Sequence, residues 1–119
     1  MKVCVPTMEQ GGMNDMVSPH FGRAPTFTIV DIETKEVGVL PNTSEHMGGV
    51  KPAPEIVAEA DAQIMLCSGL GPKAVQMFKQ LGIEVFVGAG GTVKDMISNW
   101  ESGIFQEATE ETACREHRH

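Results

Sequence analysis

The chain has 119 residues, of which 41% are hydrophobic and 21% charged, a composition typical of a single globular domain. Sixteen Asp and Glu against nine Lys and Arg give a formal net charge of −7, which argues against nucleic acid and anionic membranes as partners. Three cysteines without a C-x-x-C pair favour reduced thiols, and no apolar run approaches the about 20 residues of a membrane helix. We therefore expect a cytoplasmic protein.

The first half of the chain predicts three short strands in succession. Residues 2–6 alternate and are rich in β-branched side chains, and residues 26–32 show the clearest alternation. A polar turn then leads into 36–40, which closes a hairpin. Two long loops, 8–25 and 41–53, carry no apolar periodicity, and loops of this length in a small domain are commonly functional.

Beyond residue 53 the pattern changes to alternating helices and strands. Glycine ends two of the helices, and a capping-box-like pair, Thr92 and Asp95, starts the last one. The predicted elements are a helix from Pro54, a strand over 63–67, a helix from Pro72 to Gly82, a strand over 83–87 and a helix from Thr92 to Gly103.

This order, β-β-β-α-β-α-β-α, predicts an α/β domain with a mixed five-stranded sheet and helices on its faces. Right-handed crossovers give the strand order 3-2-1-4-5 with the second strand antiparallel, which is the ribonuclease H-like arrangement. We expect one domain over residues 1–105, followed by a charged, flexible tail over 106–119.

In such a sheet one edge gathers the loops that follow the first, third, fourth and fifth strands, and a crevice forms where the chain leaves neighbouring strands in opposite directions. His20, His46 and Cys67 all fall on this edge. Each has a plainer interpretation: the two histidines as solvated or loop-anchoring side chains, and Cys67 as a small core residue. The convergence makes His20 the leading candidate for a functional side chain.

Two glycine segments, Gly69 to Gly71 and Gly88 to Gly91, each join a strand to a helix start, where free N–H groups favour phosphate. Neither has the complete motif of a dinucleotide or P-loop site, and tight turns explain such glycines equally well. The tail also brings together one thiol and two imidazoles, whose spacing matches no closed zinc site. These residues are Cys114, His117 and His119.

The His-Phe-Gly-Arg-Ala-Pro motif at 20–25, followed by Phe27 and Asp31, resembles the dinitrogenase iron–molybdenum cofactor biosynthesis family, which includes NifX, NafY and the C-terminal part of NifB. The strand at 2–6, Asn42 and the Gly48-Gly49 loop also resemble this family. The resemblance covers about residues 1–105 and implies a ribonuclease H-like fold, in agreement with the topology above.

The resemblance implies a carrier, not an enzyme, which holds an iron–sulfur or iron–molybdenum cluster transiently and passes it between donor and client proteins of a metallocofactor pathway. His20 would be the cluster-side histidine, with Arg23 meeting the cluster's negative charge. His46, Cys67 and the Gly69 to Gly71 turn are further candidates for cofactor binding. One or two imidazoles and a thiol would permit release, unlike the four cysteines of a permanent site.

The sequence is compatible with two other classes of function to different degrees. A ribonuclease H-type nuclease needs clustered carboxylates for two metal ions, and the strand at 2–6 carries none, so we reject it. A phosphate- or nucleotide-binding regulatory module, built on the Gly69 to Gly71 and Gly88 to Gly91 turns, stays as the alternative.

Overall fold

A computed structural model describes residues 1–44, 48–88 and 90–108 of the chain. Within these ranges no helix is long and apolar enough to cross a membrane. The elements, in order, are β1 (Lys2–Thr7), β2 (Thr26–Asp31), β3 (Val37–Pro41), α1 (Ala53–Glu59), β4 (Ile64–Cys67), α2 (Pro72–Gln80), β5 (Glu84–Val87), α3 (Val93–Glu101) and β6 (Gln106–Glu107).

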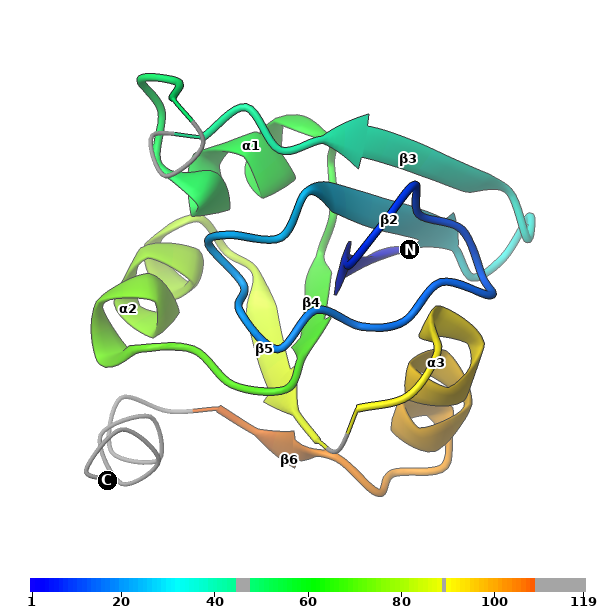
Figure 1. Cartoon of the computed structure of the whole chain (residues 1–119). Coiled ribbons are helices and arrows are strands. Elements are labelled where there is room, and N and C mark those ends of the chain that lie inside the picture. The colour runs from blue at the N-terminus through cyan, green and yellow to red at the C-terminus, as the bar shows by residue number, and fades with distance from the viewer. Residues whose placement is uncertain (45–47, 89, 109–119) are drawn as a thin grey trace.

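A single mixed sheet forms the centre of the molecule, with the strand order β3-β2-β1-β4-β5-β6 (Figure 1). Strand β1 pairs antiparallel with β2 and parallel with β4, and β5 continues the parallel part. The predicted order 3-2-1-4-5, the antiparallel second strand and the α/β class are confirmed. The edge that was expected to gather the loops therefore exists.

The prediction of five strands was wrong by one, because β6 adds a sixth strand to the edge of the sheet. Gln106 pairs with Val87 and Glu107 with Phe86, and the Ala108 N–H donates to the Val85 carbonyl at 2.7 Å. Gln106 and Glu107 fall within the segment that the sequence predicts to be a flexible tail. A two-residue polar strand has no apolar alternation, so its pairing with β5 left no pattern in the sequence.

The sheet separates two apolar cores. Helices α1 and α2 pack on one face, where Phe27, Met65 and Phe78 are fully buried. Helix α3 covers the other face, over Val5, Leu66 and its own Met96 (Figure 1). Because β1 and β4 are covered on both faces, their side chains are buried without alternation, as parallel strands of α/β sheets require.

The first half of the long loop after β1 is fastened to the start of α3. The Val93 and Lys94 N–H groups donate to the carbonyls of Asp15 and Met13, at 2.9 and 3.0 Å. The Thr92 hydroxyl accepts from Asp95, and the Asp95 carboxylate accepts from Thr92, so the predicted capping box is confirmed. The N-terminal N–H groups of α3 are thus used within the fold.

Candidate functional site

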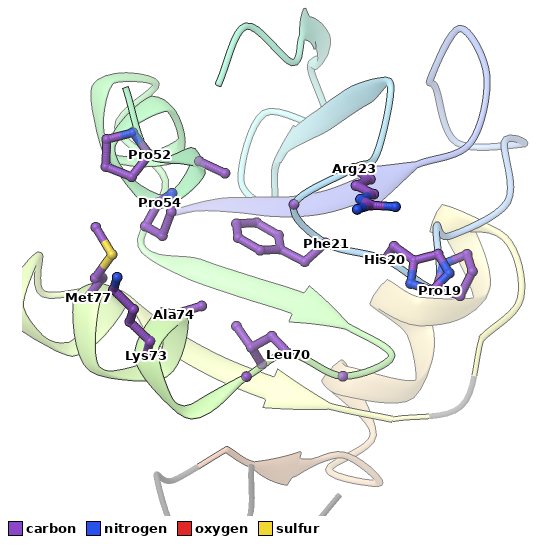
Figure 2. A pocket seen from close by; sticks show the side chains of 14 residues that line it. Pro19, His20, Phe21, Arg23, Pro52, Pro54, Leu70, Lys73, Ala74 and Met77 are labelled. Carbon is purple, nitrogen blue, oxygen red and sulfur yellow. The ribbon is translucent and has the colours of Figure 1, made fainter. Parts of the chain in front are cut away.

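A pocket of about 490 Å³ opens at the loop edge of the sheet, on the side of α1 and α2 (Figure 2). Its walls come from three places in the sequence: residues 19–23 of the loop after β1, residues 52–54 at the start of α1, and the turn and helix from Gly69 to Met77. His20, Arg23, Gly69 and Gly71, all proposed from the sequence, line it.

His20 is an exposed side chain on the wall of this pocket. A local turn fixes its backbone: the His20 N–H donates to the Ser18 hydroxyl at 3.2 Å, and that hydroxyl donates to the His20 carbonyl at 3.1 Å. Ser18 is itself buried, and its N–H donates to the Pro6 carbonyl at the end of β1. The backbone of His20 is therefore fixed by the Ser18 turn, while its imidazole is exposed at the pocket.

Phe21 anchors the next residue of the motif in the core. Its ring lies 5.7 Å from the ring of Phe27 on β2 and 5.2 Å from that of Phe78 on α2, measured between centroids. Only 6% of its surface is exposed, and the exposed part belongs to the pocket wall. This aromatic contact joins the loop that carries His20 to the helix across the pocket.

Asn42 holds the backbone on both sides of Arg23. Its side-chain amide donates to the Gly22 carbonyl at 3.0 Å and to the Ala24 carbonyl at 2.8 Å, and its oxygen accepts from the Ser44 N–H at 2.9 Å. Asn42 is 7% exposed, so these bonds form away from water, where leaving them unmade is costly. The position of the Arg23 backbone is therefore determined by a side chain outside the pocket.

The pocket is cationic although the chain as a whole is acidic. Arg23, Lys73 and His20 are exposed at its walls, and no carboxylate is among the fourteen described residues that line it. The two ion pairs formed within the described part of the chain lie elsewhere, between the Met1 amino group and Glu33 and between Lys51 and Glu59. This arrangement favours an anion and disfavours a bare metal cation.

Apart from Arg23, Lys73 and His20, few side chains around the pocket can donate a hydrogen bond. Pro52 is the N-cap residue of α1, Pro54 is its second residue, and Pro72 is the first residue of α2. Each of these prolines lacks a backbone N–H group that a phosphate could use. None of the described lining residues has a hydroxyl or carboxamide side chain. The remaining surface is largely apolar, including Phe21, Leu70 and Ala74.

The second glycine turn is not part of this pocket. Its helix, α3, is already capped by Thr92 and by the carbonyls of the loop after β1. A β-carbon at Gly88 would lie 2.3 Å from the Phe105 ring, so this glycine permits close packing of the chain that leads into β6. Packing and capping thus explain the part of the turn that the structure describes.

Cys67 is buried at the end of β4, with 1% of its surface exposed, and does not line the pocket. It belongs to the apolar core beneath α1 and α2 together with Cys4. Burial raises the pKa of the Cys4 thiol far above its ordinary value, with a smaller contribution from Cys67, so Cys4 stays protonated and is a poor metal ligand. His46, Cys114, His117 and His119 lie outside the described residues.

The lining also contains residues that were not predicted from the sequence, among them Lys73 and Met77 on α2. Lys73 and Met77 both lie in the helix predicted from Pro72 to Gly82, four residues apart, so helical spacing indicates that they share one side of it. Within the described ranges, no three His, Cys, Asp or Glu side chains come together as a metal site. A metal species bound here would thus meet few protein ligands.

Residues 1–103 match the family model described as "dinitrogenase iron-molybdenum cofactor". The chain belongs to this family. A relative in Methanocaldococcus jannaschii, the uncharacterized protein MJ0580, is 38% identical over 78 residues, which cover 61% of this chain and 66% of that protein.

Solved structures give the same result for the fold. The apo form of the orange protein from Desulfovibrio gigas superposes with a TM-score of 0.79 at 28% identity, covering 90% of this chain and 92% of that chain. A candidate NifB protein from Thermotoga superposes with a TM-score of 0.75 at 27% identity, covering 89% and 91%. The family resemblance inferred from the His20 motif is therefore confirmed.

Proposed function

We propose that this protein is a carrier that binds an iron–sulfur or iron–molybdenum type cluster in the pocket and delivers it to a client protein of a metallocofactor pathway. The observation that carries the proposal is the position of His20 and Arg23 on the wall of an open, carboxylate-free pocket, in a chain of the iron–molybdenum cofactor family. The cluster is cargo in this account, and the protein is not an enzyme.

The side chains that line the pocket are compatible with reversible binding of a cluster. In this proposal the His20 imidazole supplies one exchangeable bond to a metal of the cluster. The Arg23 guanidinium, which forms no ion pair within the described ranges, offsets negative charge on the cluster without a covalent bond. Permanent iron–sulfur sites use four cysteines, whereas His20 is the only His, Cys, Asp or Glu among the described residues that line this pocket.

The alternative, a phosphate- or nucleotide-binding module, is favoured by one observation. Helix α2 starts at the pocket, its N-cap residue Gly71 is extended, and no side chain caps it. The three prolines at the helix starts weigh against it, because a phosphate at the start of a helix is bound by backbone N–H groups and a proline has none.

The test is anaerobic incubation with isolated iron–molybdenum cofactor, followed by size exclusion and analysis of iron and molybdenum in the protein peak. The wild-type protein should retain the cluster, His20→Ala should lose most of it, and Arg23→Gln should retain it more weakly. Lys79→Gln, which removes an exposed charge from α2 away from the pocket, is the matched control. Absence of cluster from the wild-type peak, or a melting shift with nucleotide instead, contradicts the proposal.

A further inference from the structure

We infer that the pocket is a binding site for an elongated organic dicarboxylate, with one carboxylate at Arg23, the other at Lys73, and a hydrocarbon chain between them. This ligand class lies beyond the proposed function. The inference does not rest on cluster binding, because it depends only on the charges and the lining of the pocket.

The two ends of the pocket carry cations from different elements. Arg23 lies with His20 in the loop after β1 at one end, and Lys73 lies with Met77 on α2 at the opposite end (Figure 2). Neither Arg23 nor Lys73 forms an ion pair within the described ranges, and no carboxylate is among the described lining residues. The pocket therefore offers two separate places for negative charge, and a compact anion at one end leaves the cation at the other end unpaired.

Each end suits a carboxylate that stays in contact with water. The Arg23 and Lys73 side chains are exposed, so a carboxylate that pairs with either of them keeps part of its hydration. The Arg23 guanidinium can bind a carboxylate in bidentate geometry, and the His20 imidazole beside it can donate a further hydrogen bond. Helix α2 begins at the pocket without a side-chain cap, so backbone N–H groups of its first turn can join Lys73.

An apolar floor separates the two ends. Phe21 and Leu70 lie between them, and Ala74 lies on the side of Lys73 (Figure 2). Phe21 and Leu70 are packed in the core, with 6% and 4% of their surfaces exposed, so the floor is in place before a ligand binds. No described lining residue has a hydroxyl or carboxamide side chain that could pair with a polar group in the middle of the ligand. The middle of the ligand should therefore be a hydrocarbon chain.

Unbranched dicarboxylates from succinate to sebacate test the spacing of the two cations. Isothermal titration calorimetry at constant ionic strength gives the dissociation constant of each compound and of the monocarboxylate with the same number of carbon atoms. For the wild-type protein, the dicarboxylate affinity should pass through a maximum with chain length, because one length matches the two cations. At that length the dicarboxylate should bind at least about fivefold more tightly than its monocarboxylate, the effect of one charge-assisted hydrogen bond.

Lys73→Gln and Arg23→Gln each remove one of the two cations and leave the apolar floor unchanged. Either variant should lose the maximum with chain length. Its affinity for the best dicarboxylate should fall to about the affinity of the wild-type protein for the matched monocarboxylate. Lys79→Gln, which removes an exposed charge from α2 outside the pocket lining, should behave as wild type.

Glucarate tests the floor, because it is adipate with a hydroxyl group on each central carbon atom. These hydroxyl groups would lose water over Phe21 and Leu70 without a described side chain that can replace it, so glucarate should bind at least about threefold more weakly than adipate.

Four results would each overturn the inference: no dicarboxylate binding, an affinity that only rises with chain length, a maximum that survives in Lys73→Gln or Arg23→Gln, or equal binding of adipate and glucarate. Retention of the iron–molybdenum cofactor is measured with a different ligand, so failure of the carrier function and failure of this inference are seen separately.

Discussion

The ring of Phe21 meets the ring of Phe78 edge to face, with centroids 5.2 Å apart and planes at 60°. This contact connects the loop after β1 with α2, which are the two segments that face each other across the pocket. The same residue thus belongs to the core and to the pocket wall. Its neighbour His20 owes its place to this anchor and to the Ser18 turn.

Replacing Phe21 with Ala should lower the free energy of unfolding by about 3–5 kcal/mol, because it leaves a cavity between Phe27 and Phe78. Phe21→Leu keeps most of the buried volume and should cost clearly less. Urea denaturation measures both values. A Phe21→Ala protein as stable as the wild type would show that the ring does not anchor the loop.

Asn42→Ala should destabilise the protein by about 2 kcal/mol or more, because it leaves the half-buried Gly22 carbonyl, the buried Ala24 carbonyl and the Ser44 N–H without their partner. It should also weaken anion binding, since Arg23 lies between the two released carbonyls.

Asn42→Asp removes the two bonds that the Asn42 amide donates and keeps the bond that its oxygen accepts. The carboxylate can still accept from Ser44, but it has no N–H for the two carbonyls and adds a charge at a site that is 7% exposed. We expect it to be less stable than Asn42→Ala in urea denaturation. The opposite order of stability would mean that the retained Ser44 bond outweighs the cost of the added charge.

The hairpin between β2 and β3 should weaken in acid. The N–H groups of Thr34 and Glu33 bond to the Asp31 carboxylate and hold its pKa below the ordinary value of 3.8. A lowered folded pKa means that the carboxylate stabilises the fold above pH 3.8 and that this contribution disappears as the pH falls through the folded pKa.

The difference in unfolding free energy between wild type and Asp31→Asn should therefore be constant near neutral pH and shrink below pH 3.8. Carbon NMR of the Asp31 carboxyl group gives the folded pKa directly. A titration midpoint at or above 3.8 would contradict the role of the turn N–H groups.

The parallel part of the sheet and its helices could be predicted, because the sequence signals for each strand and helix lie within that segment itself. Strands β1, β4 and β5 are short apolar runs, α2 and α3 have glycine and capping signals at their ends, and right-handed crossovers then fix the order. Strand β6 was not predictable, since two polar residues acquire their partners only once β5 is in place.

The candidate site was predictable in part for a similar reason. His20 and Arg23 lie in the loop after β1, which the topology places at the loop edge of the sheet. The pocket opens at this edge. Cys67 was also expected at this edge because it ends a strand. The end of a strand does not determine how deeply a side chain is buried, and Cys67 lies in the core. To predict that Lys73 and Met77 line the pocket, one must know how α2 is oriented relative to the sheet. Only the assembled fold shows this orientation.

The proposed function depends on direct ligation of the cargo by His20. Protein labelled with nitrogen-15 at histidine can be loaded with iron–molybdenum cofactor in its paramagnetic state and studied by pulsed EPR. We expect a nitrogen-15 coupling from one imidazole, present in the wild type and absent in His20→Gln. A loaded wild-type protein without this coupling, or a coupling that persists unchanged in His20→Gln, would contradict it.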